Sequence, residues 1–321
     1  MKVFYFPKRH QNNFISINIE VLKALGFEVF SLREIYKLHN IFDMKKVVVF
    51  NWVEDQPYST QYGFFKSWLC FLYYFFTIIF CKLTSANVIW VKHNFKPHSK
   101  KAIAYRHLVT CFLMNFLNIK ETTLESYVGD SYIPHPLYLN DGELQRLAQN
   151  CLEASSFQVA FFGHVKRYKG LHSALGQWPV GLPLKISGKV ESESYKRELE
   201  RIIGKRNIDV TIDDGFLTDL ALEKLLMTTS HVLLPHEANS MISSGSFYHA
   251  ISFGCNILAG KAEFFIHKSN QHDFVNVCDF NTLDLDNLSE KYKSRRHVIN
   301  EALSFYSREK LKSHWIELLK G

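Results

Sequence analysis

The sequence has no pattern typical of zinc binding, and its cysteines give no sign of disulfide bonding. Six cysteines are scattered along 321 residues without a CxxC pair or a zinc-ligand spacing, and most lie within apolar runs, as small buried residues do. No two histidines have the helical spacing of a zinc site, and there is no internal repeat. We therefore expect a protein of a reducing compartment that holds no metal and needs no cofactor.

A secretion signal and a membrane-length apolar run are missing as well. The N-terminal segment has only a few apolar residues before Pro7, so it lacks the apolar core of a secretion signal. The longest apolar run, Trp68–Cys81, is well short of the roughly 20 residues that span a bilayer as a helix. We expect a cytoplasmic protein in which this run does not cross a membrane.

Composition indicates a folded protein with an anionic partner. A content of 47% hydrophobic and 21% charged residues in 321 residues is typical of a globular chain with two domains. The formal charge of +7 fits an anionic ligand, an anionic membrane surface or a nucleic acid. Charge alone does not choose between these partners.

The aromatic run and a basic segment after it favour a membrane surface. Lys66 and Lys82 flank the run, which fits either a buried helix or a helix partly inserted among lipid headgroups. Each basic side chain of the segment 92–106 adds about 1 kcal/mol of attraction near an anionic leaflet. Residues 64–82 and 92–106 together predict docking on an anionic membrane. Nucleic acid is not expected, because the aromatics do not alternate with the basic residues.

Short apolar strands separated by helical segments predict a parallel sheet in the first half. They are Val3–Phe6, Glu28–Phe30, Val47–Phe50 and Val88–Val91. In such a sheet the ligand loops follow the carboxyl ends of the strands. The first loop carries His10, which we place among the acceptor-side residues.

Three further residues of these loops are candidate catalytic groups. Glu54 and Asp55 follow the third strand, where a carboxylate suits a general base, although a solvated surface pair remains an alternative. His93 and Asn94 end the fourth strand and are expected to face the ligand crevice, although a lone histidine is also often structural.

Two prolines, Pro134 and Pro136, mark a boundary near residue 138. We therefore expect an N-terminal domain at 1–138 and a C-terminal domain at 139–300. Helices at 301–321 are expected to pack back on the first domain, because the last of them has one apolar face.

Two turns of the second half are candidate anion sites. Phe157–Phe162 is a buried strand that leads into a turn from Gly163 to Gly170, where clustered cations suit a diphosphate. Further along, Leu233–Ala259 is expected to form strand, loop, helix and strand, with Ser243, Ser244 and Gly245 opening the helix. Such a helix start offers free N–H groups to a phosphate. A surface charge run and an ordinary helix cap are the alternatives.

These motifs resemble bacterial GT-B glycosyltransferases of family 4 type, which assemble exopolysaccharide, capsule or O-antigen. The resemblance covers nearly the whole chain. Its residues are His93, Asn94, Pro97 and His98 in the first half, Gly163, Tyr168, Lys169 and Gly170 at the first turn of the second, and Pro235, Ser244, Gly245, Ala250 and Gly254 in the later loop.

The resemblance implies an α/β fold of two Rossmann-like, doubly wound domains facing a cleft. It also implies that Lys169, with Arg167, neutralises the diphosphate of a nucleotide-sugar donor, while the N–H groups at Ser244 and Gly245 hold its β-phosphate. The remaining donor-side candidates are Gly163, Glu237, Ser243 and His249.

The sequence departs from this family at three positions. His164 stands where many retaining members have arginine, and Met241 and His249 stand where they have two glutamates. Glu237 lies nearby but out of register. Donor identity and retaining stereochemistry are therefore left open.

The expected activity is metal-independent transfer of a sugar, with hexose favoured, from a nucleoside-diphosphate donor. The expected acceptor is a lipid-linked or oligosaccharide molecule of capsule or lipopolysaccharide synthesis, at the inner face of the plasma membrane. An inverting enzyme would need a base, for which the order of preference is Asp55, Glu54, His93. A sugar-nucleotide epimerase and a non-catalytic subunit of an assembly complex remain alternatives, and a nucleic-acid-binding protein is the least favoured.

Overall fold

The computed structural model describes residues 1–10, 12–53, 64–94, 104–150, 158–236 and 241–320. The chain divides into two compact units, each described here by itself. Unit 1 comprises Met1–Pro136, Ser240–Ser243 and Arg308–Gly321, and unit 2 comprises Leu137–Asn239 and Ser244–Ser307. The division after Pro136 lies two residues before the boundary expected at 138, and only the last helix of the C-terminal segment belongs to unit 1.

Unit 1 is built on a five-stranded parallel sheet in the order β2-β1-β3-β4-β5. The strands are β1 Lys2–Phe6, β2 Glu28–Ser31, β3 Val47–Asn51, β4 Asn87–Val91 and β5 Lys120–Thr122. The chain passes from β1 to β2 on one side and then to β3 on the other. The strand order therefore reverses between β1 and β3, and the loops that follow these two strands lie at a typical ligand position.

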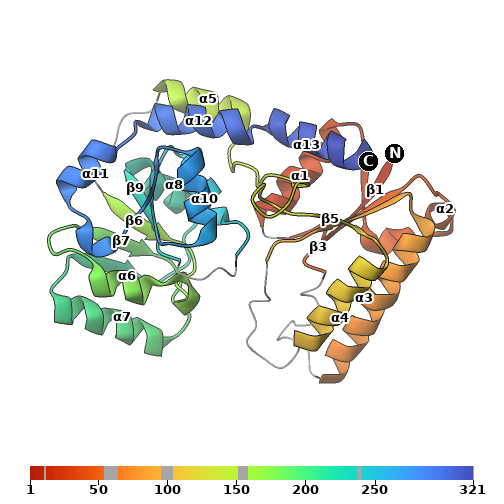
Figure 1. Ribbon diagram of the computed structural model, residues 1–321, viewed down its shortest axis with the longest axis horizontal. Helices are drawn as coiled ribbons and strands as arrows, with labels where there is room; N and C mark the ends of the chain where they lie inside the picture. Colours follow the sequence, from red (N-terminus) through yellow and green to blue (C-terminus); the bar gives the residue numbers. More distant parts are fainter. Residues whose placement is uncertain (11, 54–63, 95–103, 151–157, 237–240, 321) are drawn as a thin grey trace. The chain divides into compact units, whose positions relative to one another are not determined.

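Helices cover both faces of this sheet (Figure 1). They are α1 Asn13–Ala24, η1 Leu32–Tyr36, α2 Leu38–Ile41, α3 Phe64–Thr84, α4 Ala104–Phe116 and α13 Arg308–Lys320. Alternate strand residues point to opposite faces. Val3 and Tyr5 pack in the cluster that includes α1 and α13, whereas Phe4 packs in the cluster that includes α3 and α4.

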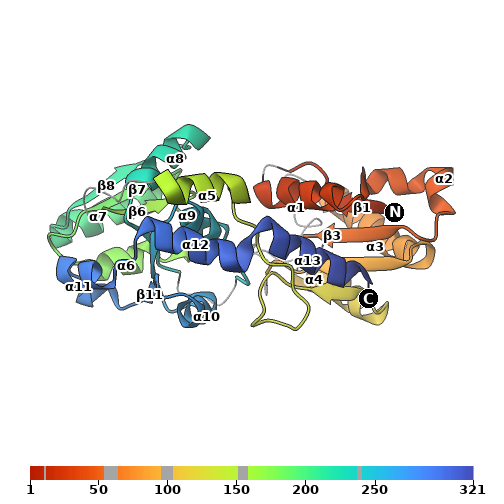
Figure 2. The ribbon, with the colours of Figure 1, turned by 90° about the horizontal axis from the view of Figure 1, so that it is seen from above.

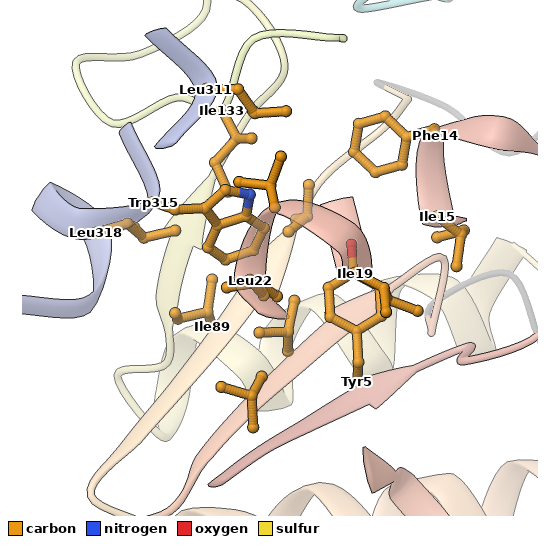
Figure 3. Close-up of a cluster of buried hydrophobic side chains, with 14 of the residues drawn as sticks. Tyr5, Phe14, Ile15, Ile19, Leu22, Ile89, Ile133, Leu311, Trp315 and Leu318 are labelled. Carbon is orange, nitrogen blue, oxygen red and sulfur yellow. The ribbon is translucent and has the colours of Figure 1, made fainter. Parts of the chain in front are cut away.

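The last helix is part of the core of unit 1. Trp315 of α13 is fully buried beside Leu22 and Ile89 (Figure 3). Its indole N–H donates to Oδ1 of Asn18 on α1 at 2.8 Å, and the Asn18 amide donates to the carbonyl of Phe14 at 2.8 Å. The end of the chain is thus fixed to its first helix.

The helix α3 corrects one expectation from the sequence. It has 21 residues, and its Phe65–Thr84 part is long and apolar enough to cross a membrane by length and composition. The apolar run was judged too short because Lys66 and Lys82 flank it in sequence, although neither interrupts the helix. Ile78 and Cys81 are fully buried against the sheet, while Phe65 and Phe76 on the outer side are 80% and 62% exposed.

Unit 2 has a six-stranded parallel sheet in the order β11-β10-β9-β6-β7-β8. The strands are β6 Val159–Phe162, β7 Leu184–Ser187, β8 Val210–Asp213, β9 His231–Leu234, β10 Asn256–Ala259 and β11 Val275–Val277. The chain fills one side through β7 and β8 and then returns to β9. The order reverses between the neighbouring strands β6 and β9, which brings the turns after them to one position at the sheet edge.

Helices also surround the sheet of unit 2, and α5 lies beside α12 (Figure 2). They are α5 Asp141–Asn150, η3 Arg167–Lys169, α6 Leu171–Gln177, α7 Glu193–Arg206, α8 Asp219–Thr228, α9 Gly245–Ser252, α10 Glu263–Gln271, η4 Phe280–Thr282, α11 Leu285–Lys291 and α12 Arg295–Tyr306.

A buried arginine joins three of these helices. Arg295 at the start of α12 is 1% exposed, and its guanidinium donates to the carbonyls of Phe253, Leu226 and Thr229 at 2.6, 3.1 and 2.6 Å. These carbonyls lie at the C-terminal ends of α8 and α9, where backbone acceptors lack helical partners. Arg295 therefore caps two helices from the interior.

Candidate functional site

The turn after β6 lies against the end of β7 through two glycines. Gly163 has φ +87° and donates its N–H to the carbonyl of Ser187 at 3.1 Å. A Cβ on the neighbouring Gly188 would lie 1.9 Å from the carbonyl oxygen of Gly163. Only glycine allows this close approach. The sequence alone marks Gly188 only as the residue that follows the apolar run Leu184–Ser187, and no local pattern shows which backbone it meets.

Lys169 is the buried cation of this turn. Its side chain is 9% exposed, and its Nζ lies 5.2 Å from the ring centroid of Phe161 and 3.8 Å from the position of a Cβ on Gly163. Burial, and then the charge of Lys166, lower the pKa of Lys169 to about 8. Within the described ranges the ammonium has no hydrogen bond and no ion pair. A buried cation without an anionic partner is costly unless a ligand supplies the negative charge.

His236 lies beside this lysine and was not recognised from the sequence. It follows β9, is 5% exposed, and its Nδ1 has no hydrogen-bond partner among the residues that the structure describes. Burial, and then the charge of Lys169, lower the pKa of His236 to about 3. The imidazole is therefore neutral, and its ring lies 6.2 Å from that of Tyr168. In sequence His236 lies just after β9, and only the fold brings it to Lys169.

The start of α9 supplies backbone donors at the neighbouring strand end. Ser244 is the N-cap, and its Oγ accepts from the N–H of Phe247 at 3.4 Å. Ser243 belongs to unit 1, where its hydroxyl donates to Oε1 of Glu125 at 2.8 Å. Across the described part of the chain, the N–H groups of Gly245 and Ser246 have no acceptor. The Ser243 hydroxyl is thus engaged by Glu125, whereas the backbone N–H groups of Gly245 and Ser246 are available to an anion here.

Two other donor-side candidates have protein partners. The guanidinium of Arg167 pairs with Glu198 on α7, with Nη1 to Oε1 at 3.1 Å, and lies over the ring of Tyr195 at 4.8 Å. His249 stacks on Tyr138 with ring centroids 4.2 Å apart, and burial lowers the pKa of His249 to about 4. These contacts assign both side chains to the packing of unit 2. Glu237 lies outside the described residues.

In unit 1, His93 is held at the end of β4 by an amide. Its Nε2 lies 3.0 Å from Oδ1 of Asn51, whose Nδ2 donates to the carbonyl of Phe6 at 3.0 Å. Because a carbonyl only accepts, the Asn51 amide must turn its oxygen toward His93. The Nε2 of His93 therefore carries the hydrogen, and Nδ1 keeps a lone pair. This tautomer suits a general base.

Aromatic rings surround His93. Trp52 stacks on it with centroids 4.0 Å apart, and His10 stacks on Trp52 at 5.3 Å. Phe14 meets His93 edge-on at 5.0 Å. Burial, followed by the charges of His135 and His10, holds the pKa of His93 well below its ordinary value of 6.5. The side chain is therefore neutral. Asn51 and Trp52 were not recognised as site residues, because their role depends on β3 and β4 being neighbours.

The other first-half candidates are placed as follows. Asn94 forms an isolated antiparallel bridge with Met241 within unit 1. Glu54 and Asp55, the preferred candidate bases, lie outside the described residues. His10 is exposed, and its Nδ1 accepts from the N–H of Asn12 at 3.0 Å. The structure thus gathers His10 and His93 around Trp52.

No protein-family model and no curated protein matches the sequence. Several solved structures match the chain over its whole length. AviGT4, a glycosyltransferase involved in avilamycin A biosynthesis, is 13% identical with a TM-score of 0.63, over 100% of this chain and 97% of that one. Anabaena HepE with UDP-glucose is 14% identical with a TM-score of 0.62, over 100% and 99%. The chain has the GT-B fold.

A further GT-B structure extends this comparison. An E. coli protein described as trehalose-6-phosphate bound with UDP-2-fluoro glucose is 10% identical, has a TM-score of 0.61, and aligns over 100% of this chain and 99% of that one. At such identities the likeness establishes the GT-B fold and leaves the chemistry to the residues described above. The expected α/β architecture with two parallel-sheet domains is confirmed.

Proposed function

We propose that this protein is a glycosyltransferase that takes a sugar from a nucleoside-diphosphate donor, with a UDP-sugar as the first choice. The observation that carries the proposal is Lys169, a buried cation without a described anionic partner, at the point where the strand order of unit 2 reverses. The GT-B structures that contain UDP-glucose and UDP-2-fluoro glucose support a UDP donor.

The chemistry follows from the leaving group. Departure of a nucleoside diphosphate builds negative charge on the β-phosphate, and stabilising this charge is the main demand on the site. Lys169 supplies one positive charge, and the N–H groups of Gly245 and Ser246 supply fixed dipoles at the edge of the neighbouring strand. We assign no metal to this site, because these groups supply the charge stabilisation themselves.

On the acceptor side we assign the base to His93 among the described residues, with Asp55 and Glu54 as the other candidates. A neutral His93 with its hydrogen on Nε2 leaves Nδ1 to take a proton from an acceptor hydroxyl. We propose a hexose as the sugar and a lipid-linked or oligosaccharide acceptor of bacterial surface polysaccharide synthesis. The exposed apolar side of α3 supports a location at the inner face of the plasma membrane, on an anionic surface.

A non-catalytic binding subunit is the second candidate. His249 stands where retaining members of the resembling family carry a glutamate, and it is packed between Tyr138 and Phe162. Met241 stands at the other glutamate position and is 8% exposed. Neither residue offers a carboxylate to a donor, which favours a protein that binds a nucleotide sugar without retaining transfer. A sugar-nucleotide epimerase would turn over the donor without an acceptor.

Thermal unfolding with a panel of UDP-, GDP- and CMP-sugars tests the proposal. A ligand at 100 times its dissociation constant adds about 2.7 kcal/mol to the free energy of unfolding. We expect one nucleotide class to raise the melting temperature of the wild type. The same sugars should not raise the melting temperature of Lys169→Met. The exposed neighbour Lys166→Met is the matched control and should respond like the wild type. If no nucleotide sugar stabilises the protein, the donor proposal is wrong.

A further inference from the structure

Unit 1 contains a cavity of about 790 Å³ beside α3 that the transfer chemistry does not use. It lies at the carboxyl ends of β1 and β2. Its lining comes from the loop after β1, from the first part of η1 and from α3, and includes Lys8, Arg9, Arg33, Glu34 and Tyr73. His93 and Trp52 do not belong to this lining.

The lining is positively charged. It holds three cations, Lys8, Arg9 and Arg33, against one carboxylate, Glu34. The carboxylate has partners already, because its Oε1 accepts from the N–H of Ser31 at 3.0 Å and its Oε2 from Lys37 at 3.4 Å. Neither arginine makes a hydrogen bond or an ion pair with any residue in the described ranges. Two guanidinium groups that have no partner among the described residues match the oxygen geometry of a phosphate or diphosphate.

An apolar groove of about 520 Å³ adjoins the cavity, because Tyr73 lines both. The groove runs along α3 and is lined by Tyr36, Tyr73, Phe76, Thr77, Ile79, Phe80 and Leu83. The hydroxyls of Tyr36 and Thr77 in this lining form a hydrogen bond with each other, with their oxygens 2.6 Å apart. Phe76 and Leu83 are 62% and 72% exposed. A basic cavity with an apolar groove beside it fits a molecule with an anionic head and a hydrocarbon chain.

The cavity and the candidate base lie at the same edge of the sheet. Arg9 lines the cavity, and the next residue, His10, stacks on Trp52, which stacks on His93. His93 follows β4 and the cavity lies at the carboxyl ends of β1 and β2, so both belong to the carboxyl edge of the sheet of unit 1.

We propose that the cavity binds the diphosphate of a lipid-linked acceptor and that the groove along α3 holds the first part of its prenyl-type chain. The inference rests on the proposed function, since it specifies the acceptor of that reaction. The head group binds through Arg9, Arg33 and Lys8. The chain packs on Tyr73 and Phe76, which explains why a helix that faces the sheet core on one side leaves its aromatic residues open on the other.

Calorimetric titration with farnesyl diphosphate and with inorganic pyrophosphate tests this site. The titrations use the full-length Lys169→Met protein, so that the donor site does not contribute. We expect farnesyl diphosphate to bind at least about tenfold more tightly than pyrophosphate, because the chain buries apolar surface. Arg9→Ala with Arg33→Ala should weaken both ligands at least about tenfold, through loss of charge-assisted hydrogen bonds. Lys23→Ala with Lys45→Ala removes the same charge from exposed positions of unit 1 and should change neither.

A second pair of variants separates head from chain. Phe76→Ser should remove the advantage of farnesyl diphosphate and leave pyrophosphate binding unchanged, whereas Phe112→Ser on α4 should alter neither. Equal affinity for the two ligands in the starting protein would overturn the lipid assignment in favour of a free anion. Unchanged affinity in the double arginine variant would overturn the cavity as the site.

The result is separable from the donor proposal. If farnesyl diphosphate binds but no nucleotide sugar stabilises the wild type, the donor proposal is wrong and the cavity remains a lipid-phosphate site. If a nucleotide sugar stabilises the wild type but farnesyl diphosphate does not bind, the donor proposal stands and the lipid-phosphate site is wrong.

Discussion

Lys169 is the side chain on which the donor site depends most. Replacing it with methionine keeps the packing on Phe161 and removes the charge. We expect turnover to fall by roughly 10²- to 10³-fold, the usual loss when one stabilising group for developing charge is removed. Steady-state rates with the donor identified by thermal shift measure this. Lys166→Met should retain near-normal turnover, and a similar loss there would mean that general charge, rather than the buried ammonium, is responsible.

The lowered pKa of Lys169 predicts that the free energy of unfolding depends on pH. The pKa of Lys169 is lowered from 10.5 to about 8, so between these values the unfolded chain binds more protons than the folded one. The free energy of unfolding should therefore rise with pH from about 8 to about 10.5, by about 3 kcal/mol at one pKa unit per 1.36 kcal/mol. Urea titrations of the wild type and Lys169→Met across this range give the difference. Parallel pH profiles for the two proteins would refute the burial of a charged lysine.

His93 gives a prediction for catalysis. Because the pKa of His93 lies well below 6.5, the acid limb of the pH–rate profile should fall below pH 6.5 if this residue is the base. Asn51→Asp places a carboxylate beside Nε2, which favours the imidazolium and raises the pKa of His93. The acid limb of this variant should move to higher pH. A limb that stays in place while the variant remains folded would assign the base elsewhere, with Asp55 and Glu54 the next to test.

Most strands could be predicted because burial on both faces leaves continuous apolar runs. The apolar runs Leu184–Ser187, His231–Leu234 and Asn256–Ala259 predict three strands that β7, β9 and β10 confirm to the residue. The apolar face of the last segment predicts a helix from about residue 308 to 320, which α13 confirms. The edge strands β5 and β11 were missed, since three residues such as Lys120–Thr122 carry no recognisable pattern. The apolar length of α3 was underestimated because a lysine and a serine near its start interrupt the apolar run without interrupting the helix.

The site was less predictable than the strands. Turn residues such as Gly163, Lys169 and Gly245 could be proposed from the sequence, because each follows a buried strand with a chemically distinctive sequence. Partners such as Asn51 of His93 could not, because the contact joins two strands 42 residues apart in sequence. Nor does the sequence show that Arg167 is paired with Glu198, which depends on where α7 packs.

Arg295 connects α8, α9 and α12, and its loss should affect all three. Arg295→Met fills part of the space but removes the charged donors to the carbonyls of Phe253, Leu226 and Thr229. We expect the free energy of unfolding of unit 2 to fall by about 3 kcal/mol or more, as for other broken buried charge networks. Chemical denaturation followed by far-UV circular dichroism measures it. The exposed neighbour Arg296→Met should stay within about 0.5 kcal/mol of the wild type.

The chain as a whole carries a formal charge of +7, and unit 1 has exposed apolar side chains on α3 and α4 that can contact a membrane. On α3 and α4, Phe76 and Phe112 are 62% and 69% exposed. A cationic protein with exposed aromatics is attracted to an anionic bilayer by charge and retained by apolar insertion. We therefore expect the wild type to sediment with anionic vesicles, less with neutral ones, and less as salt screens the attraction.

Phe76→Ser with Phe112→Ser should weaken vesicle binding at least about tenfold, because full burial of each ring contributes roughly 1.5–3 kcal/mol. Both side chains point away from the core, so the melting temperature should hold. The matched control is Phe216→Ser with Leu220→Ser, which removes two apolar side chains of similar exposure, 75% and 61%, from unit 2 and should bind vesicles like the wild type. If vesicle binding falls equally in both double variants, binding follows general surface hydrophobicity. If it falls in neither, the exposed side chains of α3 and α4 have no role at the membrane. Only a loss confined to the first pair places unit 1 on the bilayer, with the cavity lined by Arg9 and Arg33 beside the helix that meets it.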